Sequence, residues 1–228
     1  MLRLFSGTLV STLLIGALIM APAYAFTGTL DWPRGWLVVG VFFLASALGG
    51  VYFLITDPGL VRERASAPQT KTAADTLATL FILLGVIGFC TAAVYDSRQL
   101  QLLPLSSALS LVAGAVVFAI GIAIVVWTFR VNSFATTIVE VQEARNQRVI
   151  KTGPYRFVRH PMYFGAIWFF AGVALMLESP ATALAAIVIF PVAFLPRMLV
   201  EESVLRRDLA GYAEYQSRIR TRILPGIF

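Results

Sequence analysis

Charged residues are scarce in this chain, and their scarcity excludes an ordinary soluble protein. Only 13% of the 228 residues are Asp, Glu, Lys or Arg, whereas 58% are hydrophobic. A soluble globular domain carries about 25% charged residues. The apolar residues come in long runs rather than at helical spacing, which is typical of membrane proteins. The composition therefore predicts an all-α integral membrane protein.

Cysteine and histidine are almost absent as well. The one cysteine, Cys90, lies in the middle of an apolar run, so the sequence offers no disulfide framework and no cysteine pair with metal-site spacing. The one histidine, His160, has no partner ligands, so we expect no metal site. Internal repeats and low-complexity linkers are also lacking.

Six apolar runs predict about six transmembrane helices. A helix needs about 20 residues to cross about 30 Å of hydrocarbon. The fifth run has 16 residues and reaches only about 24 Å. We expect it to be a short hairpin partner of the sixth, with Glu178-Ser179-Pro180 as the turn. The expected spans are Leu4–Ala25, Gly35–Ile55, Leu77–Tyr95, Leu105–Phe129, Met162–Leu177 and Ala181–Val200.

The first run also imitates a secretory signal. Arg3 precedes it, and Ala23-Tyr24-Ala25 resembles a cleavage site with small residues. The apolar run is longer than a typical signal core, however. We therefore expect it to be retained as a membrane span.

Positive charges are distributed unevenly between the spans, and this predicts an orientation. With the N-terminus inside, the inner segments and the inner end of the sixth span hold 16 of the 18 Lys and Arg residues. Only Arg34 and Arg98 lie outside. The positive-inside rule then predicts that both termini are cytoplasmic, in the inner (plasma) membrane if the protein is bacterial. Topology accounts for the net charge of +6, so no nucleic-acid partner is needed.

The polar residues divide the chain into two regions. Residues 1–129 form a four-span membrane region, and residues 130–228 hold most of the inner polar segments. Thr136–Gln142 and Arg148–Thr152 partly alternate in hydropathy, which favours a small cytoplasmic β-hairpin. In the C-terminal tail, residues from Glu201 to Tyr215 recur at helical spacing, which predicts an amphipathic interfacial helix.

The segment KTGPYRFVRHPMYFGAI, Lys151–Ile167, connects the polar loop that begins at residue 130 to the fifth expected span. Gly153-Pro154 is expected to turn the chain, and Pro161 to begin the fifth span, because proline is tolerated in a first helical turn. Taken alone, the segment fits a loop entering the membrane as well as it fits a ligand site, since short motifs have real false-positive risk.

A family resemblance favours the ligand site. The pattern GPYRFVRHPMYFG, followed about forty residues later by EE, then by Y-x-x-Y and a final ILP, resembles the isoprenylcysteine carboxyl methyltransferase family. It resembles the phospholipid methyltransferases of the same membrane superfamily more loosely. The similarity covers roughly residues 130–228. It implies a membrane enzyme that uses S-adenosylmethionine in a cytoplasmic pocket of this region. The sequence also lacks a GxGxxG motif after a strand, as found in soluble nucleotide-binding domains.

The resemblance also implies a set of site residues. His160 to Tyr163 would lie against the cofactor with Tyr155, while Glu201 would supply the carboxylate that binds it. Arg197 stands where the family holds the acceptor. Two departures affect the hairpin and the tail: Gln147 replaces a frequent histidine, and Leu209-Ala210-Gly211 replaces the usual FG. The implied cofactor contacts are Gln142 as a further candidate, Gln147, Arg148, Val149, Ile150, Tyr155, His160, Pro161, Met162, Tyr163 and Glu201.

These residue types suit methyl transfer for chemical reasons. S-adenosylmethionine carries a sulfonium, an ammonium, a carboxylate and two ribose hydroxyls. Glu201 can accept charge-assisted hydrogen bonds, and His160 and the tyrosines supply neutral donors. A carboxylate acceptor needs no general base, but it needs a cation such as Arg197 to hold it. Without the resemblance, Arg197 fits a membrane anchor, and Glu201 with Glu202 fits a solvated helix start.

Three functions therefore remain open at this level. The first is a methyltransferase acting on a lipophilic acceptor, a prenylcysteine-like or isoprenoid carboxylate or else a phospholipid amine. The second is an NADPH-dependent reductase of the sterol-reductase type, although those enzymes typically read RHxNYxGD where this chain has RHPMYFGA. The third is a membrane protein without catalytic activity that retains the fold.

Overall fold

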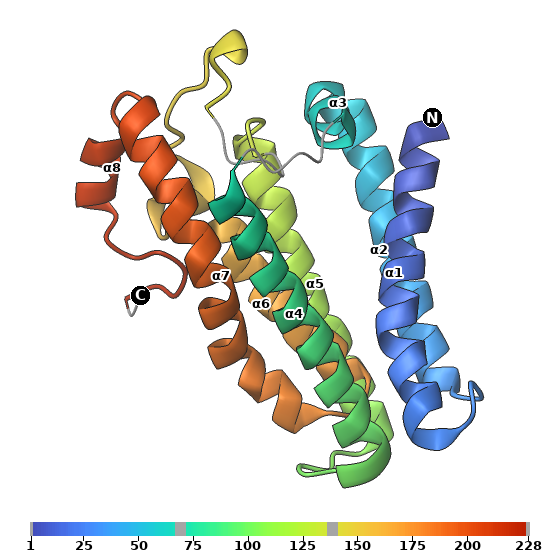
Figure 1. Cartoon of the computed structure of the whole chain (residues 1–228). Coiled ribbons are helices and arrows are strands. Elements are labelled where there is room, and N and C mark those ends of the chain that lie inside the picture. The colour runs from blue at the N-terminus through green and yellow to red at the C-terminus, as the bar shows by residue number, and fades with distance from the viewer. Residues whose placement is uncertain (1, 67–71, 136–140, 227–228) are drawn as a thin grey trace.

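The computed structural model describes residues 2–66, 72–135 and 141–226, and within them it contains helices and turns but no strand (Figure 1). The chain is thus an all-α protein. Its elements are α1 (Leu2–Thr27), α2 (Pro33–Thr56), α3 (Pro58–Ser66), α4 (Ala73–Tyr95), the π-helical turn η1 (Asp96–Leu100), α5 (Ser107–Val131), the 3₁₀ turns η2 (Glu143–Arg145) and η3 (Gly153–Arg156), α6 (Pro161–Met176), α7 (Pro180–Asp208) and α8 (Tyr212–Arg218).

Local sequence signals explain where several helices begin. Pro33, Pro161 and Pro180 each occupy the first position of a helix, where the missing N–H costs nothing and the fixed φ suits the helix. The Thr72 side chain accepts a hydrogen bond from the backbone N–H of Asp75 and so caps α4. Ser106 caps α5 in the same way.

The predicted spans agree with the helices. Within the described residues, five helices are long and apolar enough to cross a membrane, and α6 is a shorter apolar helix of 16 residues. Large apolar side chains such as Leu14, Leu48 and Leu84 remain exposed on the outside of the bundle. Such a surface on helices of spanning length suits contact with lipid, so the chain is an integral membrane protein. The short helix α3 lies in what the sequence suggested was a loop.

Glycines bring α5 and α6 into close contact. A Cβ atom on Gly121 would lie 2.4 Å from the backbone nitrogen of Phe169, and one on Gly172 would lie 2.4 Å from that of Phe118. Small residues allow membrane helices to approach this closely, which increases their packing contact. The turn between α6 and α7 is as predicted, but the main packing partner of α6 is α5 rather than α7. The expected pairing of α6 with α7 is therefore only part of the packing of α6.

The bundle has two polar ends of different character. At one end, Arg34 in the first turn of α2 contacts Glu178 at 2.7 Å, and Ser107 donates to the same carboxylate oxygen at 2.5 Å. The hydrogen bond from Ser107, assisted by Arg34, holds the pKa of Glu178 below its usual range. The other end carries α3, η2, η3 and α8, and the N-terminus lies on the same side (Figure 1). The sequence-predicted site residues belong to this second end.

The predicted hairpin is wrong where it can be compared with the structure. Most of its first strand, residues 136–140, lies outside the described residues, and residues 148–152 form no strand. The chain does reverse through η2, with the Gln147 side chain accepting from the Gln142 N–H at 2.7 Å. The alternating apolar residue Val149 packs against a cluster of tail side chains instead of a sheet face.

The C-terminal tail also differs from the expected single helix. Glu201 and Glu202 lie inside α7, not at a helix start, because the sixth span continues without interruption to Asp208. Gly211 then adopts a left-handed conformation with φ of 81°, which turns the chain before α8. The tail therefore folds back beside η3 rather than continuing along the interface (Figure 1).

Candidate functional site

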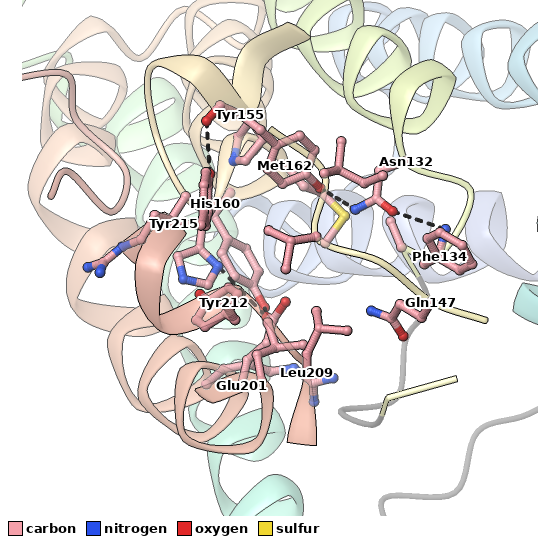
Figure 2. Close-up of a pocket in the computed structure, with 18 of the residues that line it drawn as sticks. Asn132, Phe134, Gln147, Tyr155, His160, Met162, Glu201, Leu209, Tyr212 and Tyr215 are labelled. Atoms are coloured by element: carbon pink, nitrogen blue, oxygen red, sulfur yellow. Dashed lines mark hydrogen bonds and ion pairs between the residues drawn. The ribbon is translucent and has the colours of Figure 1, made fainter. Parts of the chain in front are cut away.

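A cavity of about 350 Å³ opens at the end of the bundle that carries α3 and α8 (Figure 2). This volume lies at the lower end of the range for small-molecule sites. All but one of the residues implied by the sequence line it. These are Gln147, Arg148, Val149, Ile150, Tyr155, His160, Pro161, Met162, Tyr163, Arg197 and Glu201.

Gln142 is the exception, and it supports the wall from behind. Its side chain donates to the Phe134 carbonyl at 2.7 Å and accepts from Arg145 at 2.6 Å. Its backbone N–H holds the side chain of Gln147, which does face the cavity. Gln142 thus positions two lining residues, Phe134 and Gln147, without lining the cavity itself.

His160 connects the cavity to a buried carboxylate. It lies just before α6, and its Nε2 is 3.0 Å from Oε1 of Glu202. In a neutral ring, this contact favours the tautomer with the proton on Nε2, because the carboxylate can only accept. Nδ1 then presents a lone pair at the cavity, 3.8 Å from Oε2 of Glu201. In that tautomer, a histidine nitrogen and a carboxylate oxygen form a pair of acceptors.

The adjacent glutamates of α7 have different environments. Glu201 lines the cavity, with a side chain that is 33% exposed, and Tyr163 donates to it at 3.4 Å. Glu202 is only 5% exposed and does not line the cavity. The reading of this pair as a solvated helix start is therefore wrong for Glu202. Only Glu201 is oriented toward a ligand in the cavity.

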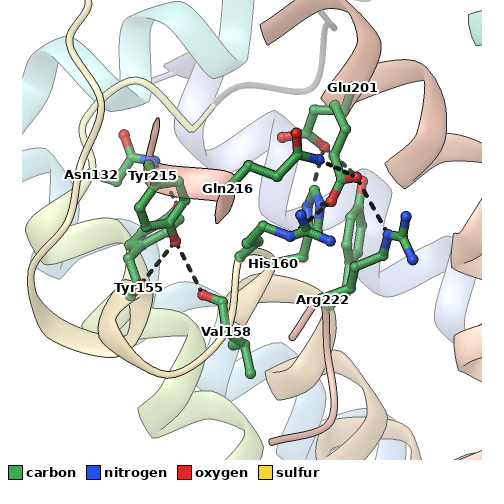
Figure 3. A network of polar contacts seen from close by, with 11 residues as sticks. Asn132, Tyr155, Val158, His160, Glu201, Tyr215, Gln216 and Arg222 are labelled. Atoms are coloured by element: carbon green, nitrogen blue, oxygen red, sulfur yellow. Dashed lines mark hydrogen bonds and ion pairs between the residues drawn. The ribbon is translucent and has the colours of Figure 1, made fainter. Parts of the chain in front are cut away.

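Glu202 is the centre of a polar network that holds the tail, and Figure 3 shows its partners His160, Gln216 and Arg222. Gln216 and Arg222 donate to its Oε2 at 3.2 and 3.3 Å, while His160 contacts Oε1. Arg159 Nε is 3.1 Å from Oε1, an ion pair that lacks hydrogen-bond geometry. The residue expected only to accompany Glu201 therefore orients His160.

Two backbone contacts complete this attachment. The N–H groups of Arg159 and His160 donate to the carbonyls of Thr221 and Arg222 at 3.0 and 2.9 Å. Tyr215 of α8 donates its hydroxyl to the carbonyl of Tyr155 at 2.8 Å (Figure 3). The tail consequently closes one side of the cavity, and Leu209, Tyr212 and Tyr215 become part of the wall.

Tyr155 is held from the α5 side as well. The Asn132 amide donates to its hydroxyl oxygen at 2.6 Å, and Asn132 also accepts from the Phe134 N–H at 3.0 Å (Figure 2). Burial raises the pKa of Tyr155 well above its usual range. Tyr155 is therefore a neutral phenol that can offer a hydrogen bond but cannot act as a base near pH 7.

Arg197 faces the cavity from the inner part of α7 and is ion-paired. Its Nη1 donates to Asp75 Oδ1 and to Thr79 Oγ1, both at 2.6 Å, and both partners belong to α4. The side chains of Arg197 and Asp75 are 10% and 3% exposed. Asp75 therefore compensates most of the charge of Arg197, which is a different environment from that of an interfacial anchor exposed to water.

Sequence reasoning missed about half of the lining residues. Several are apolar or lie far along the chain, outside every motif, whereas Arg159, Tyr212 and Tyr215 stand within the motifs but were assigned no role. Arg64 is notable because it comes from α3, before the region that carries the motifs. The missed residues are Arg64, Thr79, Ile82, Asn132, Phe134, Ala135, Arg159, Phe194, Leu205, Leu209, Tyr212 and Tyr215.

Comparison with known proteins finds similarity in the same part of the chain. Residues 109–210 match the family model described as phospholipid methyltransferase. A stretch of 83 residues is 32% identical to the Protein-S-isoprenylcysteine O-methyltransferase of Saccharomyces cerevisiae, and covers 36% of this chain and 35% of that protein. A stretch of 85 residues is 28% identical to Protein-S-isoprenylcysteine O-methyltransferase B of Arabidopsis thaliana, and covers 37% of this chain and 43% of that protein. The match thus spans less than half of either relative.

Proposed function

We propose that the chain is a membrane methyltransferase of the family whose model matches residues 109–210. The function is transfer of a methyl group from S-adenosylmethionine to a lipophilic acceptor. The observation that carries the proposal is the cavity, in which the acceptor pair of Glu201 and His160 lies among apolar and aromatic walls. Polar recognition and exclusion of water are thereby combined at the polar end of a membrane bundle.

The chemistry of the lining fits this cofactor. Glu201 Oε2 and His160 Nδ1, 3.8 Å apart, can both accept from one ammonium group or from neighbouring hydroxyls. Met162 and Ile150 offer apolar surface for the nucleoside, and backbone groups at residues 147–150 can contact it. We assign the cofactor contacts to Gln147, Arg148, Val149, Ile150, Tyr155, His160, Pro161, Met162, Tyr163 and Glu201, with Gln142 supporting them.

When bound, the cofactor supplies an electrophilic methyl group on sulfur. The protein then has to orient the acceptor in line with that bond and exclude water, and orientation alone can lower such a barrier substantially. Tyr163 is suited to orienting the bound groups because its ring stacks on Phe194 at 4.7 Å while its hydroxyl contacts Glu201. Glu202 fixes the imidazole of His160 from behind.

The acceptor is proposed to enter from the bilayer. Ile82 and Phe194 line the cavity from the membrane helices α4 and α7, so an apolar tail can remain among the spans. Its polar end would then meet the cavity beside Arg197. A carboxylate of a prenylcysteine-like or isoprenoid lipid is the proposed methyl acceptor, since it is nucleophilic without a general base. A phospholipid amine is the second candidate, because the family model that matches is described as phospholipid methyltransferase.

The function is tested by comparing ligands. A ligand of the native state raises the unfolding temperature by mass action. Cys90 is 2% exposed, so its reaction with a thiol-specific fluorophore reports unfolding of the detergent-solubilised protein. We expect S-adenosylhomocysteine to delay this reaction and NADPH to leave it unchanged. Stabilisation by NADPH alone would favour a reductase. Methyl transfer from labelled cofactor into a lipid extract would then identify the acceptor by mass spectrometry.

We further propose that the cavity and both termini face the cytoplasm. Single cysteines at positions 99 and 143 test this, because Gln99 and Glu143 are exposed at opposite ends of the bundle. A thiol reagent that cannot cross the membrane, added outside intact cells, should modify position 99 and spare position 143. The unsubstituted protein is the control, since Cys90 is buried. Labelling of position 143 alone would reverse the orientation.

A further inference from the structure

Arg64 is a cavity residue that neither the motifs nor the family match includes. It belongs to α3, whereas the matched segment begins at residue 109. Its Nη1 donates to the carbonyl of Ala135 at 3.1 Å, and its guanidinium carbon lies 4.8 Å from the centre of the Phe129 ring. These two contacts hold the side chain at the cavity wall.

The charge of Arg64 is compensated differently from that of its neighbours. Arg197 is paired with Asp75, and Arg159 is paired with Glu202. Among the described residues, no carboxylate lies within ion-pair distance of Arg64. Burial lowers the pKa of Arg64, which remains protonated near neutral pH because the usual value is so high. A half-buried guanidinium without a counter-charge from the protein is suited to an anionic ligand.

We propose that Arg64 binds a carboxylate in the cavity. This inference rests on the proposed function, because two carboxylates are then present: that of the cofactor's amino-acid end and that of the acceptor. A planar guanidinium can hold either through two parallel hydrogen bonds.

The proposal assigns a role to the N-terminal region. Glu201 and His160 supply acceptors for the cationic part of the cofactor, and they come from α7 and from the segment before α6. Arg64 adds the complementary cation from α3, which follows the first pair of spans and packs against them. The four-span region thus contributes a binding group as well as membrane anchoring.

The test compares two nucleosides that differ in the carboxylate. S-adenosylhomocysteine contains the amino-acid end, and 5′-methylthioadenosine lacks it. If Arg64 binds the cofactor carboxylate, Arg64→Gln should lower the calorimetric affinity for S-adenosylhomocysteine about tenfold, as expected for the loss of a charge-assisted bond. The affinity for 5′-methylthioadenosine should stay unchanged. If Arg64 binds the acceptor, both affinities should stay constant while KM for a carboxylate acceptor rises about tenfold.

Controls separate this inference from folding and from the proposed function. Arg62→Gln removes an exposed arginine of the same helix and should change neither affinity nor KM. Arg64→Lys keeps the charge but loses the planar fork, so an intermediate loss is expected, and protection of Cys90 checks that each variant is folded. If Arg64→Gln changed neither the affinity for S-adenosylhomocysteine nor the KM for a carboxylate acceptor, the proposed role of Arg64 would be overturned. Failure of the unsubstituted protein to bind either nucleoside would overturn the proposed function as well.

Discussion

Replacing Glu201 with glutamine is expected to weaken S-adenosylmethionine binding about 10- to 150-fold. The substitution keeps the size of the side chain and removes the charge that can accept from an ammonium, and such bonds contribute about 1.5–3 kcal/mol. Glu201 is partly exposed, so water screens the interaction and the lower part of this range is expected. Calorimetric titration of the folded variant measures the change. His160→Ala should weaken binding in the same assay.

Glu214→Gln is the matched control for this experiment. Glu214 is an exposed carboxylate of α8 that pairs with Arg218 at 2.6 Å and lies outside the cavity wall. Its loss should leave cofactor affinity unchanged, since exposed ion pairs contribute little. Equal affinities for the Glu201→Gln variant and the unsubstituted protein would show that Glu201 is not a cofactor ligand.

Replacing Arg197 with lysine is expected to lower methyl transfer to a carboxylate acceptor by about 10²-fold. Lysine keeps a charge that can still pair with the buried Asp75, so folding and cofactor affinity should be preserved. It cannot reproduce a guanidinium that contacts α4 and a ligand at the same time. A small misplacement of the attacking oxygen can cost this much in rate. The measurement pairs single-turnover methyl transfer with cofactor affinity.

Arg206→Lys provides the comparison for Arg197. Arg206 is exposed on the same helix and does not line the cavity, so its replacement should leave the transfer rate unchanged. Normal turnover by Arg197→Lys would mean that the arginine only ties α7 to α4 through Asp75 and Thr79. An amine would then become the better candidate for the acceptor. Because this variant tests rate and the Arg64 variant tests binding, the two experiments have separate readouts.

The motifs located much of the cavity wall without any structure. His160, Tyr163 and Glu201 were chosen by resemblance, and the structure brings all three to one cavity. Helical periodicity alone could not distinguish the two glutamates, because neighbouring residues on a helix point about 100° apart and either could face the ligand; only the resemblance selected Glu201. Packing of the tail against Glu202 decides which one does.

The β-hairpin failed for a related reason. Alternating apolar residues indicate only that one face will be buried, and the partner that buries it lies elsewhere in the chain. Val149 packs against the tail cluster of Leu209, Tyr212 and Tyr215, and residues 148–152 pair with no strand. A single 3₁₀ turn at η2 suffices to reverse the chain.

The sequence by itself determined the membrane class, the spans and the end of the bundle that gathers the polar motifs. Each of these follows from local hydropathy, because a buried backbone in lipid must form helices wherever the chain is apolar for long enough. Tertiary structure alone decided the ion pair between Asp75 and Arg197, the close approach of Gly121 to α6 and the entry of Arg64 into the cavity. These contacts join residues far apart in the chain, so they depend on how helices pack and rotate, which hydropathy does not specify.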